Sequence, residues 1–152
     1  MKVLVCGSRA AKDQDAAWAA LDEIQGWTVH DAERVMGMVF ACTWEKYGPI
    51  SCVVTGSASG RDTHAEKWAK AREIAYRGHP APWRTHGAWC RCRAPRPVIC
   101  KAAGPWRNAE MLRREDVAAF PVALCIAFPG GAGTRSMVEL ARAAGIVVRE
   151  VG

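Results

Sequence analysis

The sequence predicts an α/β fold built on a doubly wound, mostly parallel sheet with helices on both faces. Two observations support this class. Short apolar runs rich in valine alternate along the chain with segments whose apolar residues recur at helical spacing. In addition, three of the apolar runs end in turns that contain glycine. The length of 152 residues fits a single domain spanning residues 1–152.

The first predicted elements are a strand and two helices. The strand covers residues 3–6, and Asp13 or Asp15 caps the helix that follows. A second helix is expected within residues 31–47, interrupted by Gly37. The first helix carries an apolar stripe at the spacing i, i+3, i+4 and i+7, made of Ala17, Ala20, Leu21 and Ile24.

The middle of the chain predicts two more strands with a helix between them. The strands cover residues 51–54 and 74–77, and the helix runs from Arg61 to Glu73. Residues from about 79–103 are rich in cysteine, arginine and proline and show little periodicity. Because long irregular segments in compact domains are usually functional or disordered, we expect an insertion there.

The last third of the chain predicts two helices and two strands. Gly104-Pro105 opens a helix, with the proline at its favoured first position. The apolar run 122–127 predicts a buried strand, and the helix after it ends at Gly145. Residues 146–151 predict a final strand at an edge of the sheet.

The turn after the strand at 122–127 predicts an anion site. Glycines let a ligand approach the backbone, and the free N–H groups at a helix start attract negative charge. Thr134 is the expected N-cap, and Arg135 would add a guanidinium to a phosphate. The alternative is a tight turn whose glycines serve only its shape. The residues of the anion site are Pro129, Gly130, Gly131, Gly133, Thr134 and Arg135.

Two further glycine turns follow predicted strands, at residues 7–9 and 56–60. Because parallel strands place their carboxyl ends on the same side of a sheet, all three turns should border one crevice. None of the turns matches G-x-G-x-x-G or G-x-x-x-x-G-K-[ST], which argues against an ordinary kinase, NTPase or NAD dehydrogenase. Each turn is accompanied by an arginine, namely Arg9, Arg61 or Arg135.

Four motifs span nearly the whole chain: Val3-Leu4-Val5-Cys6-Gly7-Ser8-Arg9, Gly56-x3-Gly60-Arg61-Asp62, Gly104-Pro105-x-Arg107-Asn108-x-Glu110 and Pro129-Gly130-Gly131-x-Gly133-Thr134. In this order they resemble the YspA/YpsA-like branch of the SLOG superfamily. That superfamily includes the lonely-guy phosphoribohydrolases and the DNA-processing protein of natural transformation. The resemblance implies a Rossmann-like fold and a pocket for nucleotides or nucleotide-derived small molecules such as ADP-ribose derivatives.

Carried over by position, the resemblance implies a ligand site drawn from all four motifs. Each motif contributes residues at a turn or at a helix start. The implied ligand-binding residues are Gly7, Ser8, Arg9, Gly56, Ser57, Gly60, Arg61, Asp62, Arg107, Asn108, Pro129, Gly130, Gly131, Gly133, Thr134 and Arg135.

One departure from the hydrolytic relatives bears on catalysis. In those relatives the loop has a sequence similar to Pro-Gly-Gly-x-Gly-Thr-x-x-Glu, and its glutamate works near the glycosidic bond. This chain has Met137 at the position of that glutamate. Glu139 lies two residues further on, and two residues turn a helical side chain by about 200°. Asp62 and Glu110 are the acids inside motifs that could bind a ribose hydroxyl or act as catalytic acid–base groups. The sequence therefore leaves enzymatic activity open.

The insertion carries a candidate metal site. His86, Cys90, Cys92 and Cys100 have the spacing H-x3-C-x-C-x7-C, and three thiols with one imidazole suit a tetrahedral structural zinc ion. The C-x-C spacing is not the usual C-x2-C, so free thiols in a loop are the alternative. The other cysteines in predicted strands are expected to be small core residues: Cys6, Cys52 and Cys125.

The formal charge of +6 is concentrated in residues 84–114, where eight basic residues face only Glu110. This segment favours an anionic partner, although a solvated surface would have the same composition. Nucleic acid is one candidate, since nearby tryptophans could stack on bases: Trp83, Trp89 and Trp106.

No apolar run is long enough to span a membrane, and the first residues do not form a signal peptide. We therefore expect a cytoplasmic protein, without a membrane partner, that forms a homo-oligomer. The favoured function is to sense or sequester a phosphate-bearing, nucleotide-derived small molecule of the ADP-ribose or NAD-derivative type. The alternatives are an N-glycosidic phosphoribohydrolase acting on nucleoside monophosphates and a nucleic-acid binder using residues 84–114.

Overall fold

The computed structural model describes residues 1–37 and 49–152, which form a five-stranded sheet. All four strand pairings are parallel, and the strand order is β3-β2-β1-β4-β5. This is the order of the doubly wound Rossmann type, which confirms the predicted fold class. The strands are β1 (Lys2–Cys6), β2 (Cys52–Thr55), β3 (Ala75–Gly78), β4 (Val122–Ala127) and β5 (Val147–Glu150).

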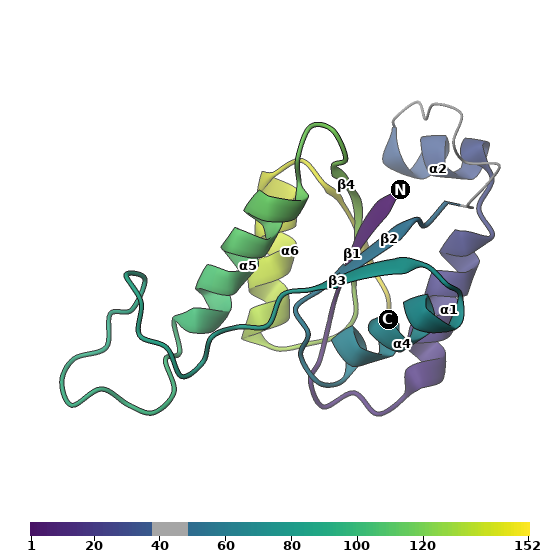
Figure 1. Cartoon of the computed structure of the whole chain (residues 1–152). Coiled ribbons are helices and arrows are strands. Elements are labelled where there is room, and N and C mark those ends of the chain that lie inside the picture. The colour runs from purple at the N-terminus through teal and green to yellow at the C-terminus, as the bar shows by residue number, and fades with distance from the viewer. Residues whose placement is uncertain (38–48) are drawn as a thin grey trace.

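Helices cover both faces of the sheet (Figure 1). α1 and α4 pack on one face, and α5 and α6 pack on the other. The helices are α1 (Gln14–Gln25), α2 (Val29–Met36), α4 (Arg61–Ala71), α5 (Ala103–Glu115) and α6 (Ala132–Ala143). α2 ends at Met36, with Gly37 as its C-cap, and the predicted continuation of this helix to residue 47 lies outside the described residues.

The central strands are buried on both faces, which explains their unbroken apolar runs. Val3 and Val5 of β1 belong to the core between the sheet and α1 and α4. Leu4 and Cys6, the alternate residues, belong to the core beneath α5 and α6. The apolar stripe predicted for α1 is buried in the first of these cores.

Helix starts were predicted less accurately than strands. Asp13 caps α1, as expected, because its carboxylate accepts from the N–H of Ala16 at 3.2 Å. The predicted N-cap at Thr134 is wrong, since α6 begins at Ala132 and Gly131 occupies the cap position. α5 also begins early, at Ala103, so Pro105 is its third residue rather than its first.

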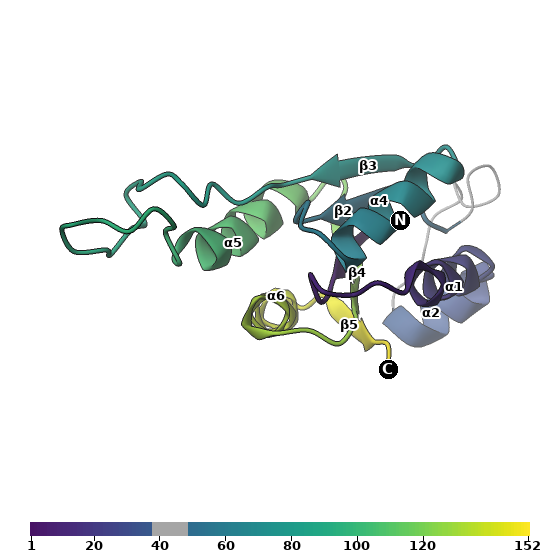
Figure 2. The ribbon, with the colours of Figure 1, turned by 90° about the horizontal axis from the view of Figure 1, so that it is seen from below.

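Residues 79–102 contain no helix or strand. They leave the end of β3 as a long excursion beside the first turn of α5, and both views place this excursion beyond the edge of the sheet (Figures 1 and 2). The segment therefore extends the surface at the carboxyl ends of the strands.

No helix within residues 1–37 or 49–152 combines the length and the apolar character needed to cross a lipid bilayer.

Candidate functional site

A cavity of about 530 Å³ opens at the carboxyl ends of the strands. It is bordered by the turns after β1, β2 and β4 and by the first turns of α5 and α6. The chain builds outward from β1 in one direction through β2 and β3 and in the other through β4 and β5. The cavity thus lies at the topological switch point, where open α/β sheets bind ligands.

The turns after β1 and β4 contact each other through their backbones. The N–H of Ser8 donates to the carbonyl of Pro129 at 3.1 Å. Gly130 has to be glycine, because a Cβ there would overlap the Thr134 hydroxyl. This close approach holds the turns after β1 and β4 against each other.

The first turn of α6 exposes backbone N–H groups to the cavity. The first intrahelical hydrogen bond runs from the Arg135 N–H to the Gly131 carbonyl, at 3.1 Å, so the N–H groups of residues 132–134 have no partner within the helix. An added Cβ would meet no atom within 4 Å at Gly131 or at Gly133. The positive end of the helix dipole therefore faces open space.

α4, α5 and α6 lack side-chain caps, whereas α1 and α2 have them. α1 and α2 are capped by Asp13 and Thr28. α5 follows Ala102 and α6 follows Gly131, and neither of these residues makes a side-chain cap hydrogen bond. The uncapped start of α6 is suited to an anionic ligand, whereas at the start of α5 the Ala103 N–H donates to the Cys100 carbonyl and Pro105 has no N–H.

Arg107 and Asn108 connect the elements around the cavity. The Arg107 guanidinium donates to the carbonyl of Gly56 and, at 2.6 Å, to that of His79. Asn108 accepts from Arg107 Nε at 3.0 Å and donates to the Gly133 carbonyl at 3.1 Å. The guanidinium occupies the space beside Gly56, so a Cβ at this position would displace it. These two side chains hold α5 against the strand ends and the α6 turn.

Among the lining residues within 1–37 and 49–152, Asp62 is the one carboxylate, and it is buried. Its Oδ2 accepts from the Ala58 N–H at 3.2 Å. Burial raises the pKa of Asp62 to about 6, although the backbone N–H of Ala58 and the Arg107 guanidinium act in the opposite direction. A buried carboxyl with a raised pKa in a cleft is typical of a functional residue.

Cationic side chains outnumber this carboxylate around the cavity. Arg9, Lys101 and Arg107 line it, and burial lowers the pKa of Arg107. The Arg9 guanidinium lies 4.6 Å from the centre of the Trp83 ring, which also lines the cavity. Lys101 and Trp83 were predicted only as parts of the basic segment and its stacking tryptophans, and not as ligand residues of this cavity, because they come from the irregular segment and follow no recognisable spacing.

The structure brings most of the predicted ligand residues to the cavity and places the others elsewhere. Those that line it are Gly7, Ser8, Arg9, Gly56, Asp62, Arg107, Asn108, Gly131, Gly133 and Thr134. Pro129, Gly130 and Arg135 line a neighbouring hollow of about 420 Å³. The ligand contacts of all these residues stay predictions.

Three other predicted residues have structural contacts of their own. The Ser57 hydroxyl donates to Glu66 at 2.9 Å. The Arg61 guanidinium donates to the Asp13 carbonyl and lies 4.8 Å from the centre of the Phe128 ring. Gly60, with a φ of 77°, lies against the Ser8 carbonyl, where a Cβ would overlap it.

The candidate acid Glu110 is paired on the outer side of α5. Its carboxylate accepts from Arg113 and Arg114, each at 2.7 Å, and these hydrogen bonds lower the pKa of Glu110 to about 2. Met137 is buried and lines the cavity, whereas Glu139 lines the neighbouring hollow. Asp62 is therefore the predicted acid that the structure places at the cavity.

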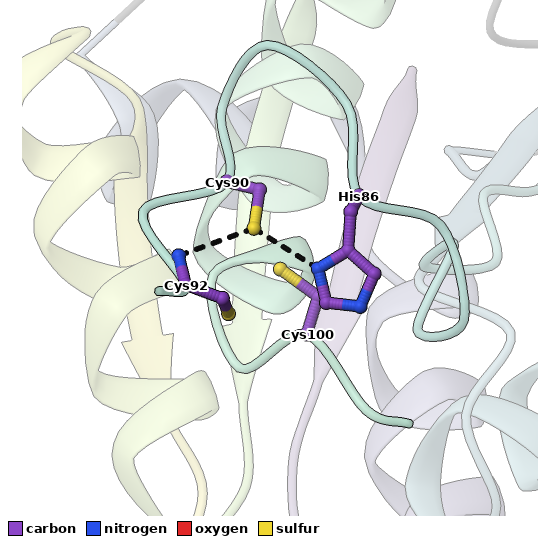
Figure 3. Close-up of side chains that lie close together, drawn as sticks. All are labelled: His86, Cys90, Cys92 and Cys100. Carbon is purple, nitrogen blue, oxygen red and sulfur yellow. Dashed lines mark hydrogen bonds between the residues drawn. The ribbon is translucent and has the colours of Figure 1, made fainter. Parts of the chain in front are cut away.

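The four predicted metal ligands lie together in the insertion (Figure 3). Their ligand atoms all fall within 4.8 Å of one another: His86, Cys90, Cys92 and Cys100. His86 Nδ1 is 3.0 Å from Cys90 Sγ, and the Cys90 Sγ accepts from the Cys92 N–H at 3.3 Å.

The predicted nucleic-acid surface is only partly available for stacking. Trp89 and Trp106 stack on each other with ring centres 3.9 Å apart, so one face of each ring is covered. Arg113 and Arg114 are paired with Glu110. Nucleic-acid binding by this segment stays a prediction.

The fold and the cavity together define a Rossmann-like α/β protein with a basic crevice at the carboxyl ends of its strands. Residues 1–86 match the family described as the YspA, cpYpsA-related SLOG family, and the chain belongs to this family, as predicted. Membership suggests a nucleotide-related ligand or a phosphoribohydrolase-like activity. The matched range ends where the irregular segment reaches its first candidate metal ligand, His86.

The chain is also similar to the Gene 61 protein of Mycobacterium phage D29. The two are 32% identical over 160 residues, which cover 99% of this chain and 96% of the phage protein. No solved structure gives a significant match to the chain.

Proposed function

We propose that this protein binds a nucleotide-derived, phosphate-bearing small molecule of the ADP-ribose or NAD-derivative type, as a sensor or sequestering module. One observation carries the proposal: the uncapped start of α6 shares a cavity with Arg9, Lys101 and Arg107. Backbone N–H groups and cations together favour phosphate.

The cavity also has room and contacts for the rest of a nucleotide. Its volume of about 530 Å³ lies within the usual range for small-molecule sites. The aromatic ring of Trp83 lines the cavity beneath the Arg9 guanidinium, and Asp62 offers a carboxylate that can accept from ribose hydroxyls. The cavity therefore has a suitable group for each of the phosphate, the sugar and the base of one ligand.

Calorimetric titration with ADP-ribose, cyclic ADP-ribose and NAD tests the proposal. We expect at least one of them to bind, and adenosine, which has no phosphate, to bind at least about 10-fold more weakly. An oligonucleotide titrated at two salt concentrations provides the comparison with nucleic-acid binding. Failure of all three phosphate-bearing compounds, or tighter binding of the oligonucleotide, would contradict the proposal.

Asp62→Asn is expected to weaken binding and to stabilise the fold. The folded-state pKa of about 6 lies above the ordinary value of 3.8, so ionising Asp62 costs stability above pH 6. That cost shrinks as the pH falls through 6 and vanishes below 3.8, where the residue is protonated in both states. The variant should gain roughly 1–3 kcal/mol in free energy of unfolding at pH 7.5, and less at pH 4.5.

Urea denaturation at both pH values measures this gain, with exposed Glu139→Gln as the control variant. Affinity for ADP-ribose should fall about 10-fold, since a charged acceptor for the ribose is lost. A variant that is no more stable at pH 7.5, or that binds as tightly as the wild type, would exclude this role for Asp62.

A phosphoribohydrolase activity is the second candidate, and the raised pKa of Asp62 favours it. A carboxyl group with a pKa near the working pH can donate and accept a proton during N-glycosidic cleavage. Chromatographic assay of nucleoside monophosphates for released base tests this activity. If base is released, Asp62→Asn should lower turnover at least about 100-fold, whereas Glu110→Gln should leave it unchanged. Equal activity in the Asp62→Asn variant would rule out this mechanism.

A further inference from the structure

The candidate ligand atoms of His86, Cys90, Cys92 and Cys100 are almost close enough to bind one ion. All four lie within 4.8 Å of one another (Figure 3). Around a tetrahedral zinc ion, with Zn–S of about 2.3 Å and Zn–N of about 2.0 Å, neighbouring ligand atoms lie roughly 3.5–3.8 Å apart. A contraction of about 1 Å in the widest pair would complete this geometry.

We propose that these four residues bind one structural zinc ion, and that the ion holds the wall of the nucleotide cavity in place. Three thiolates and one imidazole form a closed, soft ligand set that leaves no position for water or substrate. Such a set serves structure rather than catalysis.

The hydrogen bonds of His86 fit the role of a zinc ligand. Its Nε2 lies 2.8 Å from the Pro97 carbonyl, which can accept only from a protonated nitrogen. The neutral imidazole then carries its proton on Nε2 and directs the lone pair of Nδ1 toward the cluster. Histidines that bind metals typically donate their other ring N–H to a carbonyl in this way.

The segment that carries the four residues has almost no core of its own. Within residues 79–102, all of which the structure describes, Cys100 is the single buried residue. A segment without helix, strand or buried apolar side chains needs another source of order, and a bound metal supplies it.

Cys100 connects the metal site to the cavity. Its N–H donates to the Trp83 carbonyl at 2.7 Å, and its carbonyl accepts from Ala103 at the start of α5. The next residue, Lys101, lines the cavity, as does Trp83. An ion bound to Cys100 therefore restrains both of the residues that the irregular segment contributes to the cavity wall.

Metal content tests the site directly, without any nucleotide. The full chain, expressed with added zinc, should contain about one zinc ion by elemental analysis and native mass spectrometry. Cys90→Ser and Cys92→Ser should lose most of it, whereas Cys52→Ala, which removes a buried thiol from β2, should keep it. Cobalt substitution of the wild type should give the intense visible bands of tetrahedral thiolate coordination. A metal-free wild type, a mass that shows a disulfide, or equal zinc in the serine variants would overturn the site.

The proposal that zinc holds the cavity wall in place rests on the proposed function, and it needs a measurement separate from metal content. Removing zinc with a chelator should lower Tm and weaken ADP-ribose binding about 10-fold, the scale of one lost aromatic contact. If zinc is present and its removal leaves the affinity unchanged, the link is wrong although the zinc site stands. If no nucleotide binds in either state, the proposed function and the link both fail, and the metal analysis still decides the site.

Discussion

Replacing Gly131 with aspartate is expected to lower the affinity for ADP-ribose at least about 100-fold without destabilising the fold. Gly131 precedes α6 at the cavity, and a Cβ added there meets no atom within 4 Å. Its φ of −86° suits any residue. Aspartate would therefore place a negative charge beside the N–H groups that we propose for phosphate. Two like charges about 4 Å apart repel by about 4 kcal/mol at an effective dielectric constant of 20.

Gly131→Asn is the matched control, because asparagine has the shape of aspartate without its charge. Both side chains are good N-caps, so Tm should stay the same or rise slightly in both variants. Titration with ADP-ribose should show a small loss of affinity for Gly131→Asn and a loss of at least about 100-fold for Gly131→Asp. Equal affinities of the two variants would mean that phosphate does not bind at the start of α6.

Glu115→Gln is expected to destabilise the protein by about 3–5 kcal/mol. Lys2 and Glu115 form a buried ion pair at 3.1 Å, with side chains 1% and 4% exposed. Arg77 and His79 contact the same carboxylate, at 3.1 Å and 2.7 Å. Glutamine keeps the shape of the residue but leaves the Lys2 ammonium buried without its counterion. Since small domains are stable by about 5–15 kcal/mol, this is a large fraction of the total.

Urea denaturation measures this loss, and Glu110→Gln on the same helix is the control. Glu110 also pairs with two basic residues, but Arg113 and Arg114 are 70% and 59% exposed, so its substitution should destabilise the protein far less than Glu115→Gln. Similar losses from the two substitutions would show that burial does not set the strength of these ion pairs.

The pH dependence of the Glu115 effect has a definite sign. Burial acts to raise the pKa of Glu115, but hydrogen bonds from His79 and Lys2 outweigh it and lower the pKa below 4.5. A lowered folded-state pKa contributes stability that is complete above the unfolded value and is lost as the pH falls through the folded value. The difference in free energy of unfolding between wild type and Glu115→Gln should therefore reach its full size above about pH 5 and become smaller in more acid solution.

Most of the fold could be predicted from the sequence because it depends on local pattern. The run at 122–127 coincides with β4, since a strand buried on both faces must be apolar throughout. Helix starts were harder to predict. Thr134 has the chemistry of an N-cap, but its hydroxyl packs against Gly130, and the helix begins two residues earlier.

The sequence predicted where the turns of the site lie but not the direction of its long side chains. The glycine turns converge because parallel strands carry them to one edge. The direction of each long side chain depends on neighbours that are distant in the sequence. Arg61 turns toward the Asp13 carbonyl and away from the cavity, while Glu110 turns toward Arg113 and Arg114.

The sequence by itself determined the order of strands and helices, the family and the three turns, because each of them depends on residues that are neighbours in the sequence. Only the tertiary structure decided that Trp83 and Lys101 complete the cavity and that Asp62 is its buried carboxylate. The structure also brings together His86, Cys90, Cys92 and Cys100, which the sequence predicted as a metal site with free thiols as the alternative. Burial and convergence of side chains arise from contacts between distant residues, and no local spacing encodes them.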